Sequence, residues 1–299
     1  MRAWLRRVRR EERGDLSITG TLMAIVVFTG VLGATLTTFQ SFARDRTALE
    51  QRNGAQDGAR TAIDRVAREL RNLASPTTYQ PQAFDAAGPY DVVFKTVDRN
   101  GPNAGLNAPN IKRVRYCLTS TDPQAASLMA QTQTWTTQEP PAVPSTTACP
   151  GTGWNSTETV AVGLSNRRSG QERPVFTFNS ATLTDITTIH LELHVDDDGA
   201  GASEETTISS GVYLRNQNRK PTASFTATPS AQGIVLNGSA SFDPEGEPLT
   251  YVWYDGTTKI GSGITFTYPA TLGSSRTIQL KVYDPAVLEG VSAPQVVVA

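Results

Sequence analysis

Residues 16–43 read LSITGTLMAIVVFTGVLGATLTTFQSFA, and none of these side chains carries a charge. As an α-helix the stretch would measure about 42 Å at 1.5 Å per residue, which exceeds the roughly 30 Å hydrocarbon core of a bilayer. Its threonine hydroxyls can bond back to carbonyl oxygens of the preceding turn, so they do not prevent burial in lipid. The stretch therefore predicts a membrane-spanning helix.

The flank before this stretch is basic. Six arginines stand against two glutamates within residues 1–14, which gives +4 in a chain whose net charge is only −1. An arginine-rich flank stays on the cytoplasmic side, so residues 44–299 are predicted to lie outside the cytoplasm. A cleaved secretory signal fits less well, because the apolar stretch is about twice the usual length and no small-x-small site closes it. The small net charge gives no sign of nucleic-acid binding.

Residues 44–74 continue the helical pattern with one apolar face. The apolar residues recur at steps of three and four, which places them on one stripe of a helix: Ala55, Ala59, Ala62, Ile63, Val66, Ala67, Leu70 and Leu73. Opposite charges four residues apart, such as Arg65 and Glu69, predict ion pairs along the helix. Pro76 ends the run. The two stretches together predict one rod of about 88 Å, whose stripe needs a partner.

The sequence that follows is β-like. Candidate strands are residues 90–97, 111–118, 158–162, 175–178, 186–195 and 206–215. Ile189, Leu191 and Leu193 alternate with polar residues, as in a sheet with one buried face. Between the strands lie loops rich in Pro, Ser, Thr and Gly, notably 138–153. Packing of the helix stripe on an antiparallel sheet is the simplest way to bury both, which predicts an α+β head.

A second β segment follows the linker NQNRKP at residues 216–221. Its candidate strands are residues 223–227, 234–237, 249–254, 265–268, 277–284 and 295–298, separated by turns at Asp243-Pro244-Glu245-Gly246 and Asp284-Pro285. Short strands at regular spacing within about 80 residues predict a small β-sandwich.

The chain has two cysteines, Cys117 and Cys149. Outside the cytoplasm they would meet an oxidising compartment and could pair. Closing that loop of about 33 residues would stabilise the head by roughly 3 to 4 kcal/mol in the chain-entropy model. Two isolated buried thiols are the alternative.

The N-terminal part resembles the type IV minor pilins and the pseudopilins of type II secretion. The features that carry the resemblance are a basic leader ending in Gly14, the apolar helix, the phrase ARTAIDRVARELRNLASP at residues 59–76 and GVYLRN at 211–216. It extends over residues 1–217. It implies a filament subunit that contacts other pilins through its N-terminal helix, with a prepilin peptidase, the pilus assembly machinery and membrane lipid as further partners.

Two positions depart from the pilin pattern. Family members are cut after the glycine and before phenylalanine or methionine, with glutamate at the fifth mature position. Here Asp15 follows Gly14 and Thr19 occupies the fifth position. In the family that glutamate is thought to offset a neighbouring N-terminal amine in the fibre core, so one reason for tight assembly is missing. Cleavage between Gly14 and Asp15 stays a hypothesis.

Residues 218–299 resemble the PKD domain, an immunoglobulin-like module of bacterial surfaces. The match lies in PTASFTATPS at 221–230, in VLNGSASFDPEGEPLTYVWYDG at 235–256 and in IQLKVYD at 278–284. Tyr254-Asp255-Gly256 stands where the family usually has Gly-Asp-Gly. The resemblance implies an immunoglobulin-like sandwich that acts as an extracellular spacer or binds an unknown extracellular ligand. Its expected core residues, on shared strand faces, are Tyr251, Trp253, Ile278, Leu280 and Val282.

Catalytic and metal-binding motifs are not evident. His190 and His194 on one strand would lie about 13 Å apart, too far to share a metal. Asp196-Asp197-Asp198-Gly199 fits an exposed acidic hairpin loop better than a calcium loop. No nucleophile elbow, phosphate loop or Cys-x-x-Cys pair occurs in the sequence, so we expect no enzyme, cofactor or metal site.

The expected domains are a leader at 1–14, a transmembrane helix at 15–43, an amphipathic helix at 44–75, a pilin-like head at 76–217 and a PKD-like module at 218–299. The expected function is that of a minor pilin or pseudopilin in the cytoplasmic membrane, with its N-terminus cytoplasmic and incorporation into a surface filament as the further expectation. The alternative is an uncleaved surface adhesin or carbohydrate-binding protein that enters no filament. A third hypothesis is an anchored hydrolase.

Overall fold

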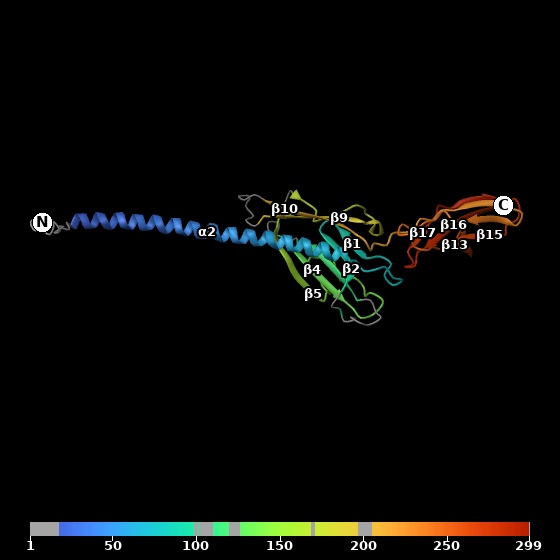
Figure 1. Cartoon of the computed structure of the whole chain (residues 1–299), viewed down its shortest axis with the longest axis horizontal. Coiled ribbons are helices and arrows are strands. Elements are labelled where there is room, and N and C mark those ends of the chain that lie inside the picture. The colour runs from blue at the N-terminus through green and yellow to red at the C-terminus, as the bar shows by residue number, and fades with distance from the viewer. Residues whose placement is uncertain are drawn as a thin grey trace, which may run out of the picture. The chain divides into compact units, whose positions relative to one another are not determined.

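The computed structural model describes residues 18–98, 101, 110–119, 126–168, 171–196 and 205–298 (Figure 1). The chain divides into two compact units between Gly54 and Ala55. The first consists of the N-terminal part of helix α2 (Ile18–Arg71). The second contains the rest of that helix and every described strand. The α+β class with antiparallel sheets is confirmed.

Helix α2 buries its predicted stripe from Ala55 onward. All eight residues of that stripe, Ala55 to Leu73 at steps of three and four, are buried, and they belong to one hydrophobic core with the sheet. The prediction of a one-sided helix clasped by β structure is thus confirmed for this unit. Burial of each such aliphatic side chain is worth about 1.5 to 3 kcal/mol relative to exposure.

The helix ends at Arg71, three residues before the predicted end of the run. The reason is a competing strand contact: Leu73 forms a bridge with Thr96, and the Ala74 amide donates to the Lys95 carbonyl. The Thr96 hydroxyl lies 2.7 Å from the carbonyl oxygen of Asn72, which accepts its hydrogen bond at the end of the helix. Carbonyls at a helix end lack partners within the helix, so this contact stabilises the end.

The predicted pairing of Arg65 with Glu69 along the helix is wrong. Arg65 binds Glu158 of the sheet at 2.9 Å, and Glu69 accepts a hydrogen bond from the Tyr116 hydroxyl at 2.7 Å. Burial and the neighbouring Glu69 carboxylate raise the pKa of Tyr116 well above its usual value. Both helix side chains face the sheet, so their partners come from distant sequence.

The helix packs on an antiparallel sheet with strand order β1-β2-β3-β4-β5-β9-β10, in which β8 also pairs with β9. The strands are β1 (Phe84–Gly88), β2 (Asp91–Val97), β3 (Ile111–Leu118), β4 (Ala126–Thr134), β5 (Ser156–Leu164), β8 (Phe176–Phe178), β9 (Thr188–Val195) and β10 (Thr206–Tyr213). The six predicted strands are confirmed, β3 with its predicted bounds and the other five with shifted ends; β1 and β4 were not predicted.

Two short elements lie between β5 and β9. A two-stranded ribbon joins β6 (Arg167–Arg168) to β7 (Gln171–Glu172), and a 3-10 turn covers Leu183–Asp185. On β9, Ile189, Leu191 and Leu193 are buried, as their alternation predicts.

The remaining strands form two sheets that share a second core. One sheet has the order β11-β12-β15 and the other β14-β13-β16-β17, with β18 also on β16. The strands are β11 (Thr226–Ser230), β12 (Gly233–Asn237), β13 (Thr250–Asp255), β14 (Thr258–Ser262), β15 (Thr265–Tyr268), β16 (Ser275–Tyr283), β17 (Glu289–Val291) and β18 (Gln295–Val298). Trp253, Ile278, Leu280 and Val282 are buried in that core as predicted, and Tyr251 packs against it.

Candidate functional site

The N-terminal unit of α2 exposes large apolar side chains on all its sides. Among the described residues of this segment, the side chains include Met23, Phe28, Leu36 and Phe39, the last with 73 % of its surface exposed. The helix is long and apolar enough to cross a membrane, and none of its most apolar window is buried within the protein. Contiguous exposed apolar surface of this extent marks a contact with lipid or with another protein.

Threonine hydroxyls within this segment donate to carbonyl oxygens of their own helix. The hydroxyl of Thr29 donates to the Ile25 carbonyl at 2.8 Å, and the hydroxyl of Thr37 donates to the Ala34 carbonyl at 2.9 Å. A group that bonds its own helix needs no water, which is the requirement that a hydrocarbon environment imposes. The expectation for the threonines is therefore confirmed.

The predicted processing residues, Gly14 and Asp15, lie outside the described residues. So do Asp197, Asp198 and Gly199 of the acidic loop. Asp196 is buried and lies 2.5 Å from the Arg168 guanidinium, so this carboxylate belongs to an ion pair and not to an exposed acidic turn.

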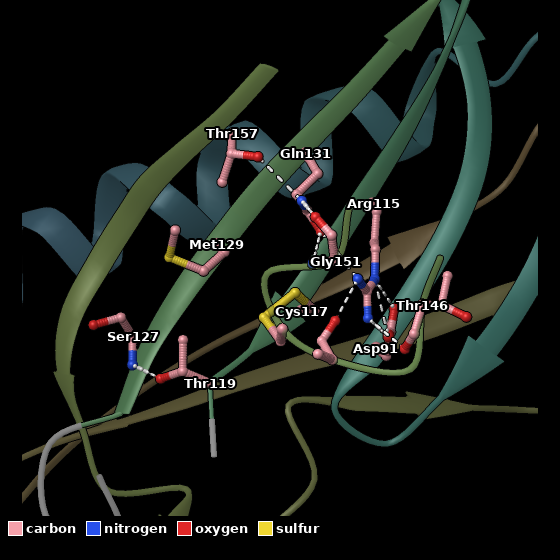
Figure 2. The surroundings of a disulfide bond; sticks show 12 residues. Asp91, Arg115, Cys117, Thr119, Ser127, Met129, Gln131, Thr146, Gly151 and Thr157 are labelled. Atoms are coloured by element: carbon pink, nitrogen blue, oxygen red, sulfur yellow. Dashed lines mark hydrogen bonds and ion pairs between the residues drawn. A yellow bond between two sulfur atoms is a disulfide. The ribbon is translucent and has the colours of Figure 1, made fainter. Parts of the chain in front are cut away.

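Cys117 and Cys149 form a disulfide that joins β3 to the long loop between β4 and β5. Figure 2 shows this loop beside the bond. The backbones of Gly151 and Ser145 pass close together. A β-carbon added at position 151 would lie 2.0 Å from the carbonyl oxygen of Ser145. Glycine is therefore required at 151 for the loop to approach so closely.

Arg115 holds the same loop from the sheet side. Its guanidinium donates to both carboxylate oxygens of Asp91 and to the carbonyl oxygens of Thr146 and Ala148, the latter at 2.8 Å. It also donates to the Gln131 side chain at 3.0 Å. Arg115, Asp91 and Thr146 are drawn together in Figure 2. One buried cation thus anchors a loop that has no regular hydrogen-bond ladder of its own.

Reduction of the disulfide is expected to lower the free energy of unfolding by about 3 to 4 kcal/mol, because it frees a loop with a sequence separation of 32. The thermal midpoint of the full chain in detergent micelles should fall by about 10 °C. These are the chain's two cysteines, so dithiothreitol and the Cys117→Ser/Cys149→Ser double variant should give the same midpoint. An unchanged midpoint in both would contradict the expectation.

The two histidines lie on strand β9, on either side of Glu192. His190 and His194 both approach the Glu192 carboxylate, and His194 is buried with its Nδ1 3.0 Å from the Thr207 hydroxyl. Arg173 lies beside His194 and binds both carboxylate oxygens of Glu205. Hydrogen bonds from Arg173 chiefly, with help from Ser165, lower the pKa of Glu205 to about 2.

This lowered pKa predicts an acid-sensitive contribution to stability. Glu205 ionises near 4.5 when unfolded and near 2 when folded, so its stabilisation is present above pH 4.5 and is lost as pH falls towards 2. Glu205→Gln should cost about 1 to 2 kcal/mol at pH 7 and less at pH 2.5. Urea unfolding at both pH values measures this, with the exposed Glu139→Gln as control. Equal losses at both pH values would refute it.

Sequence reasoning missed one group of ionisable side chains. Asp243, Glu247 and Asp284 each bring an oxygen to within 4.8 Å of the others, from two turns far apart in the chain. Asp243 and Asp284 were noted only as turn residues, because the pattern of each turn gives no sign that the other lies beside it.

No family model and no curated protein matches the chain. The features of the chain that bear on its function are the exposed apolar helix, the disulfide-bonded head and the C-terminal module.

Proposed function

We propose that this chain is a membrane-anchored structural subunit, a minor pilin or pseudopilin, of a type IV pilus or type II secretion-like filament. The observation that carries the proposal is one helix with two environments. Its N-terminal part exposes apolar residues on all sides, and from Ala55 onward its apolar stripe is buried on an antiparallel sheet. This arrangement suits a subunit that is held in lipid before assembly and packs its helix against other helices afterwards.

The orientation follows from charge and redox chemistry. Residues 1–14 contain six arginines, and an arginine-rich flank favours a cytoplasmic N-terminus. The head carries the Cys117–Cys149 disulfide, and such bonds persist in oxidising compartments outside the cytoplasm. Both observations support the same orientation in the cytoplasmic membrane, with the head on the outer side.

Assembly would proceed through the N-terminal helix. With Thr19 where related pilins have glutamate, helix packing has to supply the contacts between subunits. Gly30 and Gly33 leave open space where a β-carbon would stand, and small residues allow close approach of helices in membranes. A prepilin peptidase would cut between Gly14 and Asp15.

The C-terminal module would act as an outer spacer or binding head. Two sheets that share one core around Trp253 suit an immunoglobulin-like sandwich of the PKD type. Such a module adds surface to a subunit without involving its helix.

Membrane anchoring is tested by placing a charge in the exposed apolar segment. Val27→Arg should cost about 2.5 to 3.5 kcal/mol on insertion scales and move much of the protein out of the carbonate-resistant membrane fraction. The matched control is Leu49→Arg, which stands on the same helix beyond the charge-free stretch and is also exposed. Equal retention of both variants in the membrane would argue against a spanning helix.

Assembly is tested separately, by a photo-crosslinking residue at Phe28 in living cells. A filament subunit should crosslink to other pilin chains, and a probe at Arg60, which is exposed on the same helix, should do so less. Crosslinks from Phe28 to lipid alone, with none to pilin chains from either position, would favour the anchored adhesin or carbohydrate-binding protein. N-terminal sequencing of the mature chain reports cleavage: a retained Met1 would exclude it.

A further inference from the structure

Three carboxylates of the C-terminal module converge at one point. Asp243 and Glu247 belong to the turn between β12 and β13, and Asp284 follows β16 directly. One oxygen from each lies within 4.8 Å of the others. Asp243 is 7 % exposed and Asp284 4 % exposed, so at least two of these charges are removed from water. Burial of a carboxylate without a counter-charge is costly.

Asp243 has one oxygen fixed and one free. Its Oδ1 accepts hydrogen bonds from the backbone N–H groups of Glu245 at 2.8 Å and Glu247 at 3.3 Å. These two bonds fix the carboxylate within the turn between β12 and β13. Its Oδ2 is buried and has no hydrogen-bond partner. Buried acceptors without partners are rare in folded proteins, and each one asks for an explanation such as a bound ion.

A second partnerless acceptor comes from the linker. The Asn218 amide nitrogen donates to Asp284 Oδ2 at 2.7 Å and to the Pro81 carbonyl at 3.1 Å. Both partners are acceptors, so the nitrogen and the oxygen of this amide cannot be exchanged. The Asn218 Oδ1 is then a buried acceptor without a partner, on the same amide whose nitrogen contacts Asp284.

The partners of these carboxylates are N–H groups and not cations: besides the contacts above, the Leu288 N–H donates to Asp284 Oδ1 at 2.8 Å. The salt bridges among the described residues of the module involve other carboxylates, those of Glu245, Asp255 and Glu289. The neighbouring Arg219 is already paired with Glu245, at 2.6 Å. The three carboxylates lie within 4.8 Å of one another, and like charges at this separation repel one another unless a cation joins them.

We propose that Asp243, Glu247 and Asp284, with the amide oxygen of Asn218, bind a calcium ion. All four donors are hard oxygens of mixed carboxylate and amide type, the set that calcium accepts in flexible geometry, whereas magnesium demands a strict octahedron. The ion would occupy the space next to both partnerless oxygens and would tie the linker to the module. Sites in extracellular modules bind calcium at roughly 0.1 to 1 mM. The inference is independent of the filament proposal.

The test is thermal unfolding of the full chain in detergent micelles, in EDTA and then in 5 mM CaCl2 or 5 mM MgCl2. At the affinity of extracellular modules, calcium should raise the midpoint by about 2 to 8 °C. Magnesium should raise it by less than half as much. No calcium shift, or an equal shift with magnesium, overturns the proposal.

Variants assign the ion to this cluster. Glu247→Gln removes a negative charge from the cluster, and the Glu247 carboxylate has no hydrogen-bond partner among the described residues. The variant should therefore fold, and in EDTA it should be at least as stable as the native chain. The rise in its thermal midpoint on adding calcium should nevertheless be several-fold smaller than in the native chain. In Asp243→Asn calcium should leave the midpoint unchanged. The control Glu289→Gln changes another carboxylate of the same module and should keep the full shift. A full shift in Glu247→Gln and Asp243→Asn would place the ion elsewhere and overturn the assignment.

Discussion

Replacing Arg115 by alanine is expected to lower the free energy of unfolding by about 3 to 5 kcal/mol, the cost of breaking a buried, hydrogen-bonded ion pair. The Arg115 side chain is 1 % exposed. Its loss would leave Asp91 without its cation and would leave the carbonyl oxygens of Thr146 and Ala148 without a donor. The buried guanidinium also fills space between the sheet and the loop, so its removal should leave a cavity and loosen the loop that the disulfide still tethers.

Urea unfolding of the full chain in micelles measures the loss, and Arg46→Ala is its control. Arg46 pairs with Glu50 at 2.9 Å, yet its side chain is 83 % exposed, so its removal should change stability by less than about 0.5 kcal/mol. In Arg115→Ala/Asp91→Ala the two losses should not add, because both variants remove one contact. A loss below 1 kcal/mol for Arg115→Ala would show that the loop is held by the disulfide alone.

The features that could be predicted from sequence are those with a local period. Ala59, Ile63, Val66 and Leu70 recur at helical spacing, and the structure buries each of them. Ile189, Leu191 and Leu193 alternate with polar residues along one strand, and all three are buried. In both cases the order of apolar and polar residues along one element shows which of its faces is buried. The prediction therefore does not depend on which other element packs against that face.

The features that could not be predicted depend on distant partners. Strand β4 reads ASLMAQTQT, which has few β-branched or aromatic residues, and its place is fixed by pairing with β3 and β5. Arg65 is 93 residues from Glu158, so helix spacing favoured the wrong partner. The carboxylate cluster joins Asp243 to Asp284 across several strands. Neither turn carries a sign of the other.

Trp253→Ala is the second change expected to have a large effect, with a loss of about 3 to 5 kcal/mol in the module that contains it. Trp253 is fully buried, meets Phe225 edge to face at 5.4 Å between ring centroids, and packs among strands of both sheets. Alanine would leave a cavity, because the β-strands around it cannot collapse inward without breaking their ladders.

The indole of Trp253 also donates from Nε1 to the Gly263 carbonyl at 2.8 Å. Trp253→Phe therefore separates the two contributions: it refills much of the volume and removes the hydrogen bond alone, at about 1 to 3 kcal/mol. Hydrogen exchange of strands β13 and β16 measures both losses, and the exposed Tyr213→Ala is the control. If the module's core depends on this ring, protection should fall most in Trp253→Ala, less in Trp253→Phe and not at all in the control. Equal protection in all three would mean that the two sheets hold together without it.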